Sequence, residues 1–178
     1  DGDALTYAWT FGDGASASAA TVSHTWAQNG VYTVQLTVTD PLGLTSTATT
    51  TATVSNVAPV IGAFAGATLL PGETYGAGGA FTDPGADAWS ATVNYGDGSG
   101  VAALPLSGMS FALSHTYTAA GAFTVTVSVA DGDATAIRMQ TVTVLTPVQA
   151  IDNALALVAQ LAAAGKLNNG NANSLRAK

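Results

Sequence analysis

The chain contains no cysteine and only two histidines among its 178 residues. Without cysteine it can form neither a disulfide nor a thiol nucleophile, and two histidines alone do not supply a zinc site. The missing cysteines say little about compartment, because disulfides are only one way to stabilise an exported protein. The fold must therefore be held by buried apolar side chains and by hydrogen bonds.

Charged residues are also scarce, at 8% of the chain. Three of the four basic residues lie close to the C-terminus, so residues 1–146 hold one base, Arg138, against ten acids. A surface with this acidic excess repels phosphate backbones, and nothing resembles the basic stripe that nucleic-acid binding requires. We therefore exclude nucleic acid as a partner.

No apolar run in the sequence is long enough to span a bilayer. The sequence opens on Asp1, with neither an initiator methionine nor a basic, signal-like segment, so we expect Asp1 to be an internal residue of a longer chain. Hydrophobic residues make up 48% of the chain, which is enough to bury real cores and predicts a folded protein.

Two parts of the sequence carry the same three motifs in the same order. They are an aromatic residue followed by Gly-Asp-Gly, a Ser-His-Thr-aromatic motif, and a Gly-x-aromatic-Thr-Val block, at residues 9–14, 23–26 and 30–40 and again at 93–98, 114–117 and 121–131. The first motif recurs after 84 residues and the second after 91, so the second copy has seven more residues between them. This insertion predicts a longer loop or a hairpin.

The repeated blocks alternate apolar and polar residues with a period of two, as half-buried antiparallel strands do. Several short strands of this kind, bounded by Gly, Pro and Asp, favour a β-sandwich. The predicted inner faces are Leu5, Tyr7, Trp9 and Phe11; Tyr32, Val34, Leu36 and Val38; Trp89, Ala91, Val93 and Tyr95; and Phe123, Val125, Val127 and Val129.

These motifs together resemble the PKD (polycystic kidney disease) domain family. The resemblance implies a mainly β fold of tandem immunoglobulin-like β-sandwiches. We expect a partial repeat at 1–55 and a complete repeat at 56–146, joined at Asn56-Val-Ala-Pro59. The first repeat has no counterpart of residues 57–86, so its opening strand or strands are expected to be missing and its sheet edge to be unpaired.

The hydrophobic period changes to helical spacing after Pro147, at Val148, Ile151, Leu155, Val158 and Leu161. Residues 147–178 are therefore predicted to form a short α-helical tail, with Gly165 as its C-terminal cap and the start of a second helix at 174–176. The run from Gly165 to Leu175 resembles a small helical-hairpin module of some secreted bacterial proteins. A plain linker helix is the alternative.

The Gly-Asp-Gly motifs and the two histidines favour structural roles. Asp13 and Asp97 are predicted to be turn residues that accept hydrogen bonds from nearby amides. His24 and His115 are predicted to bond a backbone carbonyl and lock a corner beneath an aromatic side chain. Because the sequence has no activated serine or cysteine signature, no catalytic residue is assigned.

The acidic residues offer one candidate metal site, for calcium. Some PKD domains bind calcium near the domain entry, and by that resemblance the matching positions are Asn56, Asp83 and Asp87, with Asp1 and Asp3 as a truncated counterpart in the first repeat. Ordinary solvated turn aspartates explain the same residues. Neither Asp1-Gly-Asp3 nor Asp131-Gly-Asp133 continues into an EF-hand loop.

The resemblance favours a non-catalytic extracellular module that spaces or adheres within a secreted or cell-surface protein. Its expected partners are other domains of that protein and an extracellular protein or polysaccharide. The alternative is a polysaccharide- or collagen-binding accessory domain of a secreted hydrolase. Trp89, Tyr95, Trp9 and Phe11 could stack on sugars, but aromatic residues on an inner strand face more often belong to the core.

Overall fold

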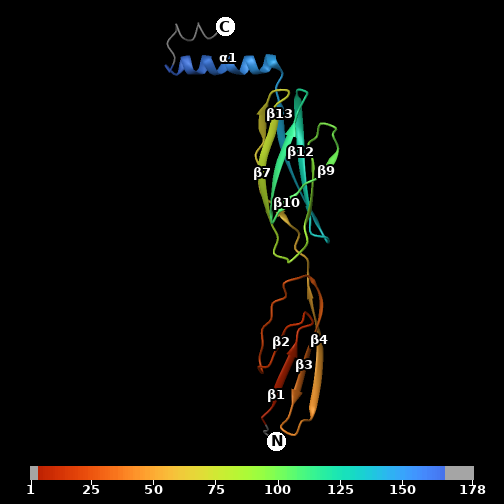
Figure 1. The fold of residues 1–178 in the computed structure, drawn as a ribbon. Coiled ribbons are helices and arrows are strands. Elements are labelled where there is room, and N and C mark those ends of the chain that lie inside the picture. The colour runs from red at the N-terminus through yellow and green to blue at the C-terminus, as the bar shows by residue number, and fades with distance from the viewer. Residues whose placement is uncertain (1–3, 167–178) are drawn as a thin grey trace.

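A computed structural model describes residues 4–166, as strands followed by one helix (Figure 1). The first repeat contains β1 (Thr6–Thr10), β2 (Ser16–Ala17), β3 (Gly30–Thr39) and β4 (Thr45–Val54). The second contains β5 (Val60–Ile61), β6 (Ala67–Leu69), β7 (Thr74–Thr82), β8 (Ser90–Asn94), β9 (Val101–Ala103), β10 (Leu106–Ser107), β11 (Ser110–Thr116), β12 (Gly121–Ala130) and β13 (Thr135–Val144). The helix α1 spans Pro147–Ala163.

The second repeat is a two-layer sandwich. One sheet has the order β10-β11-β7-β5 and the other has β6-β13-β12-β8-β9, and only the β6–β13 pair is parallel. The inner faces pack against each other, and Val125, Val127 and Val129 of β12 are fully buried between the sheets. The predicted inner face of β12 and the immunoglobulin-like fold are therefore confirmed.

The seven-residue insertion of the second repeat adds strand β10 to one sheet, whereas β9 already has a counterpart in the first repeat, β2, which pairs with β1. The insertion lies in the segment that carries β9, which pairs with β8, and β10, which forms a hairpin with β11. The hairpin turns at Gly108, whose φ of 57° lies in the left-handed region that a glycine adopts without strain. The prediction of a longer loop or hairpin is confirmed.

The first repeat, as far as residues 4–55 describe it, is a single antiparallel sheet of order β2-β1-β3-β4. Residues 19–25 match β11 of the second repeat in sequence but form no strand, because no neighbour equivalent to β7 pairs with them. The inner face is covered less well as a result: Trp9 and Leu36 are only half-buried. Among the described residues, strand β4 has no partner on the side where β13 of the second repeat pairs with β6, so the expected unpaired edge is present.

The helix α1 begins with a complete capping box. The Thr146 hydroxyl accepts a hydrogen bond from the backbone N–H of Gln149 at 3.2 Å, and the Gln149 side chain accepts one from the backbone N–H of Thr146 at 2.8 Å. The predicted cap Gly165 follows the helix with a φ of 69°. Residues 174–176, where a second helix was expected, lie outside the described residues.

The helix projects sideways from the end of the sandwich (Figure 1). It has no buried residue, and its apolar side chains Val148 and Ile151 are exposed. Within residues 4–166, no helix has the length and apolarity that crossing a membrane requires.

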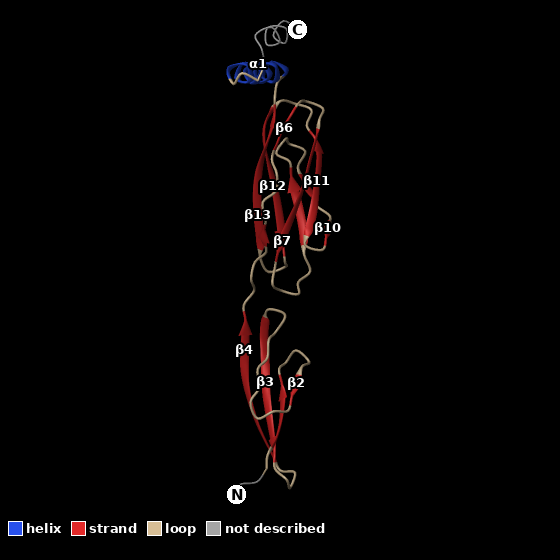
Figure 2. Ribbon diagram, turned by 90° about the vertical axis from the view of Figure 1, so that its left-hand side faces the viewer, coloured by secondary structure: helices blue, strands red, loops and turns tan. Residues whose placement is uncertain are grey.

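The two repeats stack end to end and give the molecule the shape of a rod (Figure 2). The connection between the last strand of the first repeat, β4, and the first strand of the second, β5, is five residues long, from Ser55 to Pro59. Pro59 is buried and restricts the backbone of the residue before it. The joint is therefore short and partly stiff.

Candidate functional site

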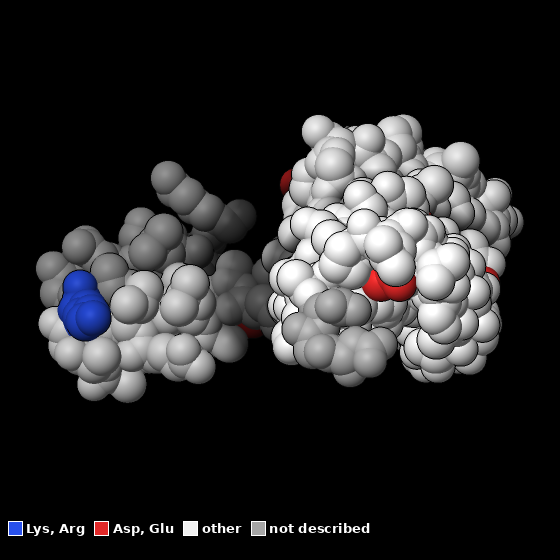
Figure 3. Space-filling model, turned by 90° about the horizontal axis from the view of Figure 1, so that it is seen from below, with Lys and Arg blue, Asp and Glu red and all other residues white. Residues whose placement is uncertain are grey.

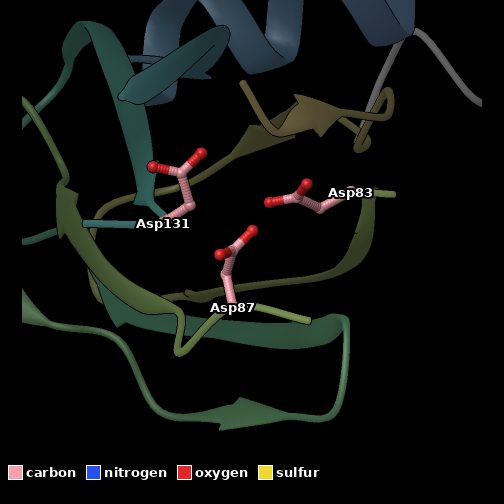
Figure 4. A group of neighbouring side chains, drawn as sticks. All are labelled: Asp83, Asp87 and Asp131. Carbon is pink, nitrogen blue, oxygen red and sulfur yellow. The ribbon is translucent and has the colours of Figure 1, made fainter. Parts of the chain in front are cut away.

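Three carboxylates from two loops of the second repeat meet at the end that faces the first repeat: Asp83 and Asp87 share the loop between β7 and β8, and Asp131 lies in the loop between β12 and β13. Each contributes one oxygen, and these oxygens lie within 4.8 Å of one another. Figure 4 shows the three side chains pointing toward a common centre.

Two of the three carboxylates are buried and held by donors from their own loops. Asp83 accepts hydrogen bonds from the Trp89 indole N–H at 2.9 Å and from the Gly85 backbone N–H at 3.2 Å. One oxygen of Asp131 accepts bonds from the backbone N–H groups of residues 133 and 134. Both side chains are thus fixed before any ligand arrives.

The other oxygen of Asp131 accepts a hydrogen bond from the Asn56 side-chain amide at 2.9 Å. This bond and the two backbone donors favour the ionised form, so the pKa of Asp131 lies below its ordinary value of 3.8, with the Asn56 amide as the largest cause. Asn56 therefore ties the linker between the repeats to the carboxylate cluster.

Asp87 differs from the other two because one of its oxygens is buried without a hydrogen-bond partner. Its Oδ1 atom accepts a bond from the Gln28 side-chain amide of the first repeat at 2.5 Å, whereas its Oδ2 atom has none. A Cβ atom at Gly85 would lie 2.0 Å from that Oδ2 atom, so a side chain at this position would displace the carboxylate. A buried oxygen without a donor is costly unless a ligand satisfies it.

The chemistry of this donor set suits a hard cation. Three carboxylates so close together repel each other, and a divalent ion bound by their oxygens would remove that repulsion. Calcium prefers carboxylate and amide oxygens in flexible arrangements, with backbone carbonyls and waters to complete six to eight ligands. The residues present therefore fit calcium better than a metal that needs imidazole or thiolate.

The predicted metal residues Asn56, Asp83 and Asp87 lie together at this cluster, whereas Asp1 and Asp3 lie outside the described residues. Asp131 was not among the predicted metal residues, because the sequence relates it only to an EF-hand loop, which Asp131-Gly-Asp133 does not continue. A signal was present in the sequence, because Asp131-Gly132 directly follows the alternating block that predicts β12.

Both repeats also contain a cluster of three aromatic rings and a histidine, which we call the aromatic corner. Its members are Phe11, His24, Trp26 and Tyr32 in the first repeat and Tyr95, His115, Tyr117 and Phe123 in the second. Each histidine stacks on the aromatic residue that precedes Gly-Asp-Gly, with ring centroids 4.1 Å apart in one repeat and 4.2 Å in the other. The predicted locked corner is confirmed.

The predicted histidine partner was wrong. His24 and His115 do not bond a backbone carbonyl but contact the carboxylates of Asp13 and Asp97, at 2.7 and 2.6 Å. A neighbouring aromatic residue bonds a backbone carbonyl instead. In the second repeat, the Tyr117 hydroxyl donates a hydrogen bond to the Tyr95 carbonyl at 2.9 Å. As predicted, the aspartates also accept bonds from the amides of their own turns.

The model of the PKD domain matches residues 1–54 and 56–145, which is most of the chain. The chain belongs to the PKD domain family. Among curated proteins, the PKD region is similar to "Collagenase ColA" of Bacillus cereus, with 31% identity over 93 residues, which is 52% of this chain and 10% of the relative. A "Microbial collagenase" of Vibrio alginolyticus is 40% identical over 55 residues, 31% of this chain and 7% of the relative. The chain therefore spans a tenth or less of these relatives.

Solved structures similar to the PKD repeats include fibronectin(III)-like modules of Clostridium thermocellum CbhA, with 16% identity, a TM-score of 0.38, and coverage of 81% of this chain and 80% of that one. The endo-fucoidan hydrolase MfFcnA4 aligns with 20% identity and a TM-score of 0.39, over 79% of this chain and 23% of that one.

The aromatic residues that the sequence offered as a sugar-stacking surface in the second repeat pack against its core. Trp89 and Tyr95 pack against the core of the second repeat, so the prediction that they are core residues is confirmed.

Ser114 neighbours His115 in sequence, but His115 Nε2 contacts Asp97, so the pair does not form a nucleophile and base. Figure 3, a view along the rod, shows only sparse charged side chains on that face.

Proposed function

We propose that the chain is a non-catalytic extracellular module that spaces and adheres within a larger secreted or cell-surface protein. The observation that carries the proposal is the end-to-end stacking of two PKD repeats through a five-residue linker. Such a unit holds its neighbours apart at a defined distance. Within residues 4–166, the two histidines contact Asp13 and Asp97 in structural corners, which supports a role without catalysis.

The proposal includes calcium at the end of the second repeat. Asp83, Asp87 and Asp131 would supply carboxylate oxygens, and Asn56 would hold the linker against them. The buried, unpartnered Oδ2 atom of Asp87 is the observation that favours a cation there. Calcium bound at this place would join two loops and the linker, and so stabilise the entry of the repeat.

A second function is favoured by the collagenase relatives: an accessory domain that holds a secreted hydrolase on collagen or a polysaccharide. The similarity to two proteins with collagenase in their names supports this accessory function. Its ligand would contact exposed groups, since Trp89 and Tyr95 are engaged in the core.

Retention of the full chain on collagen, chitin and cellulose, in calcium and in chelator, separates the two functions. The spacer function predicts no retention on any of these matrices, and the calcium part of the proposal predicts a rise of several degrees in melting temperature with millimolar calcium. Retention on one matrix would replace the spacer function by the accessory function.

The calcium part has its own variants in the same experiment. Asp87→Asn removes a ligand, and Gly85→Ala displaces the Asp87 carboxylate without changing any carboxylate; both are expected to abolish the calcium-dependent rise. Asp152→Asn removes a charge on α1, remote from the cluster, and should leave the rise unchanged. A parent chain whose melting temperature does not respond to calcium would overturn the calcium part and leave the spacer part standing.

A further inference from the structure

The loop before β3 of the first repeat contacts two loops of the second repeat through side-chain amides. Gln28 accepts a hydrogen bond from the Ala86 backbone N–H at 2.9 Å and donates one to Asp87. Asn29 donates to the Asp133 carboxylate at 2.9 Å. These bonds join residues 58 to 104 positions apart in the sequence.

The same loop also makes a backbone contact across the joint. The Ala86 N–H lies 3.3 Å from the Ala27 carbonyl, so it is shared between that carbonyl and the Gln28 side chain. Beside these contacts lies a cleft of about 150 Å³, lined by Trp26, Asn56 and Pro84 among others. The first repeat therefore contacts the second through a set of directed hydrogen bonds as well as through the linker.

The corresponding loop of the second repeat is different. The two repeats align without gaps from the histidine through strands β3 and β12, so Gln28 and Asn29 of the first repeat match Ala119 and Ala120 of the second. Alanine has no side-chain donor or acceptor and cannot make either contact. In this chain, the repeat followed by another repeat has the two amides, and the repeat followed by α1 has two alanines.

We propose that Gln28 and Asn29 form a docking latch that recognises the entry loops of a following PKD repeat and fixes its orientation. The partner surface consists of the backbone of residues 85–87 and the carboxylates of Asp87 and Asp133, which a PKD repeat presents beside its linker. The alanine pair at 119–120 marks a repeat whose next neighbour is of another kind. This inference deepens the proposed spacer function, because a rod requires a fixed angle at each joint.

A few hydrogen bonds suffice for this purpose because the repeats are already tethered. The five-residue linker makes docking an intramolecular step, with an effective concentration on the order of millimolar or more. Contacts too weak to hold two separate repeats together can therefore still select one orientation of linked ones. Without the latch, the linker alone would allow a range of angles, as is usual between domains.

Distances between spin labels in the full chain test the latch. The chain has no cysteine, so Thr47→Cys in β4 and Met139→Cys in β13 place one label on each repeat at exposed positions. We expect a single narrow distance distribution in this labelled parent. Gln28→Ala combined with Asn29→Ala should at least double its width, whereas Gln35→Ala, an exposed amide on β3 away from the joint, should leave it unchanged.

Two results would overturn the latch: a broad distribution in the labelled parent, or an equally narrow one in the double variant. Circular dichroism of each variant shows whether its strands are intact, so that a broad distribution is not mistaken for unfolding. The measurement is made in chelator, and its outcome is therefore separate from the matrix and calcium tests of the proposed function.

Discussion

At the scale of single residues, the two repeats solve the same packing problem with different side chains. Trp26 donates its indole N–H to the Phe11 carbonyl at 3.0 Å, where Tyr117 uses its hydroxyl in the second repeat. Burial raises the pKa of Tyr117 to about 12, so this hydroxyl keeps its proton through the neutral range. The corner thus requires an aromatic ring with one donor, and not a particular residue.

The aspartate that contacts the histidine of this corner makes the stability of the fold depend on pH in the acid range. The Ser99 hydroxyl and then His115 hold the pKa of Asp97 well below its ordinary value of 3.8, and in the first repeat the Ala15 amide and then His24 lower the pKa of Asp13. Because the folded-state pKa is depressed, the stabilisation is complete above the unfolded value and is lost as the pH falls from about 3.8 toward the folded value.

Asp97→Asn is therefore expected to destabilise the protein at neutral pH and to have little effect in strong acid. The cost near neutrality should be on the order of 1 kcal/mol, as for a partly exposed hydrogen bond to a charged group. Urea unfolding from about pH 6 to about pH 2 measures it, with Asp152→Asn as the control for a charge without such partners. A difference between parent and Asp97→Asn that stays constant over this range would contradict the assignment.

At the scale of elements, the sequence predicted strands well and their pairing less well. The alternation of Phe123, Val125 and Val127 with polar residues was enough to place β12, because a period of two depends only on local geometry. The failure of residues 19–25 to form a strand could not be read from their own sequence, which matches β11. A strand also needs a neighbour, and that neighbour is set by residues far along the chain.

Equivalent valines on β3 and β12 test how much the second sheet contributes. Val125 is fully buried between two sheets, whereas its counterpart Val34 is 9% exposed on a single sheet. Val125→Ala is expected to cost about 2 to 3 kcal/mol, from lost burial and the cavity it leaves, and Val34→Ala about 1 kcal/mol, because an open face relaxes more easily. Hydrogen exchange resolved by repeat measures both, and equal costs would contradict the difference in packing.

At the scale of the whole molecule, the joint was the part that sequence alone predicted least. Asn56, Asp83 and Asp87 followed from a family resemblance, whereas Asp131, Gln28 and Asn29 did not. Docking contacts such as these have no local period or motif, since each amide or carboxylate is an ordinary loop residue in its own segment. They acquire a role only when the second repeat is placed on the end of the first.

The joint also connects the latch to the candidate calcium site. Gln28 binds the Oδ1 atom of Asp87, whose Oδ2 atom has no hydrogen-bond partner, and the same carboxylate belongs to the cluster with Asp83 and Asp131. If docking orients this ligand, then docking raises the affinity for calcium. Calcium must in turn favour docking by the same factor, because coupling between two binding equilibria is reciprocal.

Gln28→Ala is therefore expected to weaken calcium binding to the full chain by about threefold to tenfold, or about 0.7 to 1.4 kcal/mol. Asn29→Ala is the matched control, because it loses a contact at the same joint. Its partner Asp133 lies outside the cluster, so the affinity of this variant for calcium should change less than twofold. Isothermal titration calorimetry measures the calcium affinity of the parent and of both variants.

Reciprocity requires that calcium narrow the distance distribution between the labelled repeats of the parent more than it narrows the distribution of the labelled Gln28→Ala variant. If Gln28→Ala bound calcium as tightly as the parent, the latch and the cation site would be independent, and the joint would keep its angle through its hydrogen bonds alone.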